Sequence, residues 1–295
     1  MRRKTTAVRI GNVVLSSEEP VLVQSMLNTS TREVDACVEQ AIRIIEAGGR
    51  LVRITAPGVK EAEMLGEIHR RLRERGYTTP ISADIHFVAE AASVAARYVE
   101  KVRINPGNFA DKRATFKKLT YTDEEYAAEL EILRQKFTEF LEVCRQYGTA
   151  VRIGTNHGSL SDRIMSRYGD TPAGMVEATM EYLRVCQACD FKDVVISLKS
   201  SDCRTMVDAV RLLVEKMEAE GMCYPLHLGV TEAGEGEDGR IRSAVGIGTL
   251  LNEGIGDTIR VSLTEEPEAE IPVACELARI CSEPEYLKGW TPLKG

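Results

Sequence analysis

Short segments of this sequence combine apolar residues with charged or polar residues at every second position. In residues 51–55, LVRIT, Val52 and Ile54 share one face of an extended strand, while Arg53 and Thr55 share the other. The same alternation puts further polar side chains on one face of their strands: Asp84, His86, Lys101, Arg103, Asn105, Arg152, Asn156, Lys199, His227, Arg260 and Ser262. Guanidinium groups bind phosphate oxygens through paired hydrogen bonds. Several of them on one wall therefore indicate a site for a multiply charged anion.

A few polar residues near the strand ends are candidates for catalysis or for a choice between a ligand contact and a core role. Glu232 directly follows the apolar segment 226–231 and is our first candidate for a general acid or base, with Asp84 as the second. Lys199 raises a different chemistry, because neighbouring cations lower the pKa of an amine and favour a Schiff base. His227, like His86, could contact a ligand or could be a hydrogen-bonded histidine of the core.

Eight β/α units are expected to position these residues. We predict strands at residues 21–26, 51–55, 81–86, 101–105, 150–156, 193–199, 226–231 and 258–263. Helical patterns follow at residues 32–47, 59–75, 87–99, 122–147, 172–188, 203–220, 243–253 and 268–281. This order predicts an α/β fold, a TIM (β/α)₈ barrel, with an open doubly wound sheet as the lesser alternative.

The barrel fold determines where the polar faces point. Because the helices cover the apolar face of each strand, the polar face must look into the lumen. Six cations would then lie there against Asp84 and Glu232, an excess of about four positive charges. Individual charges, Lys101 and Arg152 above all, could instead pair with carboxylates of nearby loops. For the whole set we favour an anionic ligand near the carboxyl ends of the strands.

Residues 225–263 look like the unit most specialised for an anion. We read a strand, a loop rich in glycine and glutamate, a helix with Gly246 and Gly248 in its first turn, and a second strand. The free N–H groups at the start of such a helix favour a phosphate.

Two regions depart from an even repeat. An enlarged helical crossover follows the fourth strand, at residues 106–150, and a long loop spans residues 156–171. Thr122 and Glu125 have the spacing of a capping box at the start of the crossover helix. We assign residues 1–281 to the barrel and residues 282–295 to a linker or tail leading to domains that this chain lacks.

Composition limits the remaining classes. The chain has 295 residues, 43% of them hydrophobic and 28% charged, as expected of a globular protein. A net charge of -7 argues against nucleic acid, and the lack of a long apolar run argues against a membrane, so we expect a cytoplasmic protein. The eight cysteines do not suggest a disulfide framework, and the single pair Cys186 and Cys189 is a weak metal or redox signal.

Several longer motifs resemble one known family. GNVVLSSEEPVLVQSM, ADIHF, KVRINPGN, SLKSSD, LHLGVTEAG and EGIGDTIRVSL occur in the order found in the N-terminal barrel of 4-hydroxy-3-methylbut-2-en-1-yl diphosphate synthases, the GcpE family. The resemblance spans nearly the whole chain. The enlarged crossover and SDRIMSRYGDTP are similar to the larger, three-domain subtype.

The resemblance implies an activity of isoprenoid biosynthesis. The family reductively opens 2-C-methyl-D-erythritol 2,4-cyclodiphosphate with electrons from ferredoxin or flavodoxin, which pass through a [4Fe-4S] cluster. It implies that Glu232 is the acid or base and that Asp84 and His86 orient the substrate. The implied diphosphate-binding residues are Arg53, Arg103, Asn105, Asn156, Lys199, His227, Arg260 and Ser262. Barrels of this family commonly pair, so a homodimer is also an expectation.

One departure from the family is large. The cluster is held by three cysteines and a glutamate of a separate C-terminal domain, and none of the eight cysteines here matches those ligands. We therefore expect a substrate-binding barrel that does not turn over by itself. Two other classes stay open: an aldolase-type enzyme that uses Lys199, and a binding module without catalysis.

Overall fold

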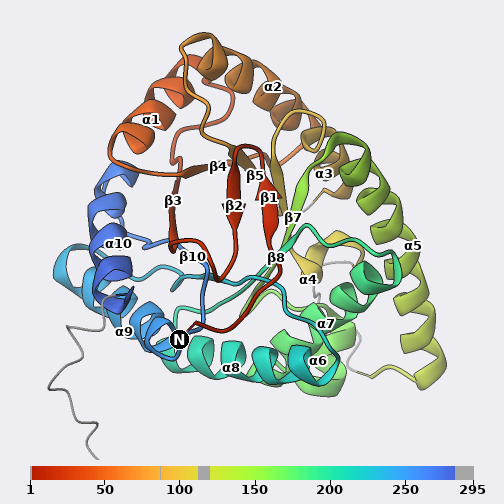
Figure 1. Cartoon of the computed structure of the whole chain (residues 1–295). Coiled ribbons are helices and arrows are strands. Elements are labelled where there is room, and N and C mark those ends of the chain that lie inside the picture. The colour runs from red at the N-terminus through yellow and green to blue at the C-terminus, as the bar shows by residue number, and fades with distance from the viewer. Residues whose placement is uncertain (1, 87, 112–119, 283–295) are drawn as a thin grey trace, which may run out of the picture.

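The computed structural model describes residues 2–86, 88–111 and 120–282. Eight parallel strands form its centre, and helices surround them in a ring (Figure 1). The strands are β3 (Leu22–Met26), β4 (Leu51–Thr55), β5 (Ile81–Asp84), β6 (Lys101–Ile104), β7 (Ala150–Asn156), β8 (Val194–Lys199), β9 (His227–Leu228) and β10 (Thr258–Ile259). They follow the predicted order, although β9 and β10 are much shorter than predicted.

The sheet closes into a barrel. Its hydrogen-bonded order is β8-β7-β6-β5-β4-β3-β10-β9, and a parallel bridge between Ile196 and Leu226 joins the two ends. The closed barrel confirms the predicted TIM fold and removes the open sheet as an alternative. As predicted, the apolar residues of β4 face the helices and its arginine faces the barrel interior. Val52 and Ile54 lie in the core shared with the helices, whereas Arg53 faces the interior.

The outer ring contains one main helix for each strand. These helices are α1 (Val34–Glu46), α2 (Val59–Glu74), α3 (Ala89–Ala95), α5 (Asp123–Tyr147), α7 (Pro172–Ala188), α8 (Cys203–Ala219), α9 (Gly236–Asn252) and α10 (Pro267–Ser282). The capping box is present: the Thr122 side chain accepts from the Glu125 N–H, and the Glu125 carboxylate accepts from the Thr122 N–H. Within the described residues, no helix is both long and apolar enough to cross a membrane.

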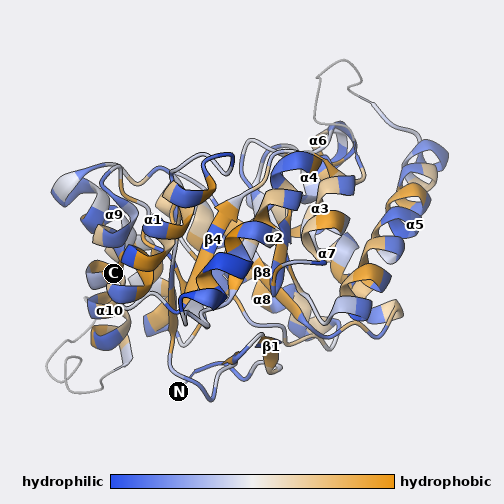
Figure 2. Cartoon of the chain, turned by 90° about the horizontal axis from the view of Figure 1, so that it is seen from above, coloured by the Kyte–Doolittle hydropathy of each residue, from blue (hydrophilic) through white to orange (hydrophobic). Residues whose placement is uncertain are grey.

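A β-hairpin that we did not predict closes the amino-terminal end of the barrel. Strands β1 (Val8–Ile10) and β2 (Val13–Leu15) pair across a two-residue turn, in which Gly11 has a φ of 57°. Figure 2 shows β1 at one end of the barrel and the small helices α4 and α6 at the other. The hairpin contributes its apolar face to a small second core, which contains Val8, Ile10, Val13, Leu15, Leu22, Leu51, Ala150 and Val195.

The two irregular regions are more helical than predicted. The crossover after β6 contains α4 (Pro106–Phe109) and the 25-residue α5. The region that we predicted as a long loop, residues 156–171, contains α6 (Asp162–Tyr168), which the Ser161 hydroxyl caps by accepting from the Ile164 N–H at 3.5 Å. The tail prediction concerns residues 282–295; α10 includes Ser282, and the remaining tail residues lie outside the described residues.

The predicted phosphate loop at Gly246 is wrong. Helix α9 begins at Gly236, so Gly246 and Gly248 lie well inside it. Its first turn holds Glu237 and Asp238, which suit the helix dipole but repel an anion. Gly246 instead permits close packing, because a Cβ there would lie 2.6 Å from Cγ2 of Val230. The start of α9 therefore does not form the phosphate site that we expected there.

Candidate functional site

A cavity of about 130 Å³ opens at the carboxyl ends of the barrel strands. Every strand from β3 to β10, or the residues directly after it, contributes to the wall. The lining consists of Met26, Arg53, Asp84, His86, Arg103, Arg152, Asn156, Lys199, Val230, Thr231, Arg260 and Ser262. Active sites of TIM barrels form at this end.

Asp84 is the carboxylate at the centre of the wall. It forms ion pairs with Arg53 and with Nη1 of Arg103, the latter at 2.8 Å, and Nη2 of Arg152 lies 3.9 Å away. Burial alone would raise the pKa of Asp84, but the guanidinium groups of Arg103 and Arg53 hold it well below its ordinary value. Asp84 therefore stays ionised. The geometry suits it to orient arginines and makes it a poor proton donor.

Arg103 is held from several sides. Its Nη2 donates to the carbonyl of Gly154 at 2.9 Å and lies 3.5 Å from Oδ1 of Asn156. Its Nη1 lies 2.6 Å from Nε2 of His86. A Cβ at residue 154 would meet Nε of Arg103 at 2.7 Å, so the glycine makes room for the guanidinium. The side chain is thus fixed before any ligand enters.

Arg260 is oriented by a residue that we did not predict, Glu270 of α10. The Glu270 carboxylate accepts from Nε and Nη2 of Arg260 at 3.0 and 2.8 Å, and also from the Ser25 hydroxyl and the Leu263 N–H. Glu270 is 1% exposed. It stands in a helix of ordinary charged pattern, so only the tertiary fold reveals its partner.

Lys199 ends β8 and reaches into the cavity with 8% of its surface exposed. Its amine lies in the space left by Gly229, where a Cβ would be 2.8 Å from Nζ. Burial lowers the pKa of Lys199 well below its ordinary value, and Arg53 and Arg152 add to the effect.

Several donors in the wall have no hydrogen-bond partner within the described residues. They are Nε and Nη1 of Arg53, Nε of Arg103, and Nε and Nη2 of Arg152. Arginine stays protonated in proteins, so these groups carry charge as well as unused N–H donors. Five basic side chains line the cavity, and Asp84 with Glu270 supplies the paired negative charge. This arrangement suits an anion with several oxygens.

The structure places the sequence-predicted residues in three groups. Arg53, Asp84, His86, Arg103, Asn156, Lys199, Arg260 and Ser262 all line the cavity. Arg152, which we thought could pair away from the site, lines it too. The other predicted residues do not line it. Asn105 caps α4 by accepting from the Gly107 N–H at 3.2 Å, His227 is buried below the cavity, and Glu232 is exposed beside the lining residue Thr231.

Glu232 has an unusual backbone. Its φ of 51° is in the left-handed region, which a residue with a Cβ rarely adopts. Such strain is found preferentially at functional sites, where the fold holds a side chain in a required position.

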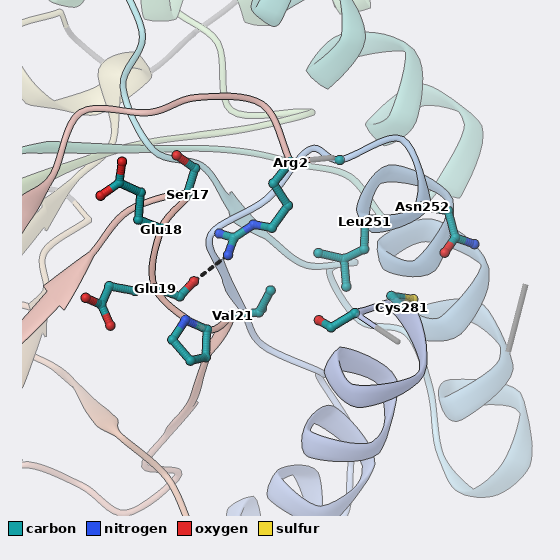
Figure 3. Close-up of a pocket in the computed structure, with 11 residues that line it drawn as sticks. Arg2, Ser17, Glu18, Glu19, Val21, Leu251, Asn252 and Cys281 are labelled. Carbon is teal, nitrogen blue, oxygen red and sulfur yellow. Dashed lines mark hydrogen bonds between the residues drawn. The ribbon is translucent and has the colours of Figure 1, made fainter. Parts of the chain in front are cut away.

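A larger cavity of about 610 Å³ lies at the other end of the barrel, where α9 and α10 end and β3 begins (Figure 3). Arg2 lies beside it, but its guanidinium donates to the carbonyls of Glu19 and Ser16 and to Asp257. Its Nε has no partner within the described residues, but five arginine nitrogens in the wall of the first cavity lack one, so this cavity offers fewer free donors.

The residues present do not fit an iron–sulfur cluster. Within the described parts of the chain, no three histidine, cysteine, aspartate or glutamate side chains form a group that could hold a metal ion. Burial raises the pKa of the Cys144 and Cys186 thiols, which disfavours the thiolate that a cluster needs. Cys186 is fully buried inside α7 and Cys189 ends that helix, so the pair serves packing.

Fold and cavity together define a TIM barrel with five basic side chains around a cavity at the carboxyl ends of its strands. The chain belongs to the GcpE TIM-barrel domain family, which it matches over residues 5–275. It is 63% identical over 284 residues to the 4-hydroxy-3-methylbut-2-en-1-yl diphosphate synthase (flavodoxin) of Parabacteroides distasonis, covering 96% of this chain and 46% of that protein. The chloroplastic, ferredoxin form of Arabidopsis thaliana is 52% identical over 280 residues, with 95% and 38% covered. The chain thus spans less than half the length of these relatives.

Solved structures agree on the fold. A dihydropteroate synthase of Yersinia pestis superposes with a TM-score of 0.60 at 12% identity, covering 94% of this chain and 99% of that one. The truncated 3-deoxy-D-arabino-heptulosonate 7-phosphate synthase of Thermotoga maritima gives a TM-score of 0.55 at 13% identity, with 95% and 91% covered. At such low identity the likeness concerns the fold alone.

Proposed function

We propose that this chain is the substrate-binding barrel of a 4-hydroxy-3-methylbut-2-en-1-yl diphosphate synthase, and that its cavity binds 2-C-methyl-D-erythritol 2,4-cyclodiphosphate. The observation that carries the proposal is the cavity wall of five basic side chains, three of which hold N–H groups without partners within the described residues. A diphosphate presents several anionic oxygens to such a wall.

The wall divides into two fixed clamps and one adaptable amine. Asp84 orients Arg53 and Arg103, and Glu270 orients Arg260, so both clamps are set before binding. Lys199, with Asn156 and Ser262 beside it, supplies donors that can adjust to the ligand. Preorganised donors lower the cost of ordering side chains on binding.

Glu232 is our candidate for the proton-transferring residue. It is exposed next to Thr231, at the mouth of the cavity, where a substrate whose diphosphate lies below would present its carbon skeleton. Its fixed left-handed backbone directs the side chain from a short loop before α9.

The complete reaction would need more than this chain. We propose an oxidoreductase in the longer protein, with flavodoxin or ferredoxin as the electron donor and a [4Fe-4S] cluster whose ligands lie outside these 295 residues. The printed names of the relatives support the two carriers. The barrel then binds and orients the diphosphate.

Calorimetric titration with the cyclodiphosphate tests the binding proposal. We expect binding that Arg103→Ala weakens by at least about tenfold, the loss of one charged hydrogen-bond set. Arg184→Ala is the matched control, because Arg184 pairs with Glu177 and Glu220 on the surface. Equal affinity in Arg103→Ala and the unmodified chain would contradict the proposal and favour a non-specific binding module.

A second candidate is an aldolase-type enzyme that forms a Schiff base at Lys199. The lowered pKa of this buried amine, caused by burial and by Arg53, favours it. Borohydride reduction in the presence of a carbonyl substrate would trap an adduct at Lys199. Failure to trap one across carbonyl substrates would count against this candidate and leave the diphosphate site as the better account.

A further inference from the structure

Below the cavity, the barrel contains a second layer of polar side chains. Gln24, Ser82, Lys101 and His227 are each 0% exposed and have polar atoms without hydrogen-bond partners within the described residues. For Lys101 the atom is Nζ, and for His227 both ring nitrogens lack a partner. Buried polar groups without partners are costly, so such a layer calls for an explanation.

Strand register places Lys101 directly beneath the anion-binding wall. Lys101 lies opposite Ser82 on one side and Ala150 on the other. On the other side of Ser82, Arg53 of β4 lies opposite it. Arg103 follows Lys101 by two residues, so both side chains lie on the same face of β6. The amine of Lys101 therefore shares the interior with the arginines of the cavity but does not line the cavity itself.

The charges around Lys101 are mostly positive. Arg53 of β4, Arg152 of β7, Lys199 of β8, His227 of β9 and Arg260 of β10 face the same interior, along with Arg103 of its own strand. The facing carboxylates are Asp84 and Glu270, and both already pair with arginines. Burial and the charges of Arg152 and Arg53 hold the pKa of Lys101 well below its ordinary value. A proton on Lys101 thus has no carboxylate of its own while the cavity holds no anion.

We propose that Lys101 takes up one proton from solvent when a diphosphate enters the cavity, and that it thereby selects ligands of high negative charge. The lone pair of the amine accepts the proton, and no bond of the ligand changes. The anion offsets the repulsion from Arg53 and Arg152, so the charged amine becomes favourable. By linkage, the proton then strengthens diphosphate binding. This inference rests on the proposed diphosphate site and adds a residue that sets its specificity from outside the wall.

Lys101 is a better proton acceptor than its neighbour His227. The ordinary pKa of a lysine is about four units above that of a histidine, so after similar desolvation the amine protonates first. Lys199 can also gain charge, but it lines the cavity and its removal would weaken binding directly. Lys101 is therefore the position where proton uptake can be separated from ligand contact.

Calorimetry of the 1–295 chain with inorganic pyrophosphate tests the proposal. Titrations at one pH, in two buffers of different ionisation heat, give the number of protons taken up. We expect uptake in the unmodified chain and a clear reduction in Lys101→Met. We also expect the preference for pyrophosphate over inorganic phosphate to fall at least about fivefold in that variant, the lower end of coupling between linked sites. His227→Gln, in the same layer, should keep the uptake.

The possible results separate the two proposals. If pyrophosphate does not bind the unmodified chain, the proposed diphosphate site fails, and this inference fails with it. If pyrophosphate binds without proton uptake, or if Lys101→Met takes up as many protons as the unmodified chain, the inference about Lys101 is overturned while the site stands. Absence of uptake in the unmodified chain overturns the inference by itself, and Lys101→Gln replaces Lys101→Met if that variant does not fold.

Discussion

The Glu270 carboxylate accepts two hydrogen bonds from Arg260, at 3.0 and 2.8 Å. Glu270 lies in α10, the helix that follows β10, and Arg260 lies in the wall of the cavity. The same carboxylate accepts from the Ser25 hydroxyl on β3 and from the Leu263 N–H. One helical residue therefore fixes a cavity arginine and the neighbouring strand together.

Glu270→Gln should lower the free energy of unfolding by about 1–3 kcal/mol, because it removes a buried acceptor and leaves a guanidinium without its counter-charge. Urea titration measures the loss. Glu265→Gln is the matched control, since Glu265 also pairs twice with an arginine, Arg240, but nearer the surface, and should cost clearly less than Glu270→Gln. Equal losses would show that burial of the Glu270–Arg260 pair does not increase its contribution to the free energy of unfolding.

Glu232→Gln should leave the affinity for the cyclodiphosphate within about threefold of the unmodified chain, because Glu232 is exposed and does not line the cavity. Placed in the full-length protein, the same change should abolish turnover. Glu235→Gln, three residues on and also exposed, is the control that keeps activity. Parallel loss of affinity and turnover would instead assign Glu232 to binding.

The buried His227 predicts how stability responds to acid. Burial and the charge of Lys199 lower its pKa well below the ordinary value in the folded state. The unfolded chain therefore binds a proton near pH 6.5 that the folded chain does not bind. Stability from this group is retained above pH 6.5 and is lost as the pH falls toward the folded pKa, by about 1.4 kcal/mol per unit.

His227→Gln should flatten the fall of stability between pH 6.5 and 5, measured by urea unfolding at several pH values. His157→Gln is the comparison, because that imidazole lies near the surface beside Asp170. Asp84 does not obscure this window: its lowered pKa means that its contribution is lost only at pH values below about 4. Identical slopes for the His227 variant and the unmodified chain would refute the assignment.

Gly246→Ala and Gly248→Ala should have opposite effects on stability. A Cβ at residue 246 would lie 2.6 Å from Cγ2 of Val230 and 2.9 Å from Cε of Met206, so we expect a loss of about 1–3 kcal/mol. At residue 248 the nearest atom is 3.6 Å away, and alanine should gain up to about 1 kcal/mol from helix propensity. Thermal unfolding separates the two. A stabilising Gly246→Ala would contradict the packing role.

The alternation of side chains was enough to predict the barrel and the inward direction of most cavity residues. The strand pattern alone predicted the inward direction of Arg53, Arg103 and Arg260, because in a helix-covered barrel the polar face of a strand must point into the interior. The start of α9 was missed because three glycines at residues 234, 236 and 239 imitate a loop, although Glu237 and Asp238 suit a first helical turn.

Other features carried little or no local signal. Glu270 looks like any surface residue of an amphipathic helix, and its burial depends on Arg260 arriving from β10. The hairpin did have a signal that we did not use, since residues 8–15, VRIGNVVL, place apolar residues on both sides of the Gly11 and Asn12 turn. The role of Arg152 could not be decided because it depends on how deep each strand sits in the closed barrel.

The N-terminal hairpin limits how a ligand could reach the barrel interior. Val8, Ile10, Val13 and Leu15 form a hydrocarbon floor under the polar layers, with Leu22 and Leu51 beside them. In the described part of the chain, a charged ligand could cross this end of the barrel only by losing its hydration against those apolar side chains, which is costly. A ligand of the cavity would therefore have to enter and leave at the carboxyl ends of the strands, and one bound there would exclude the next.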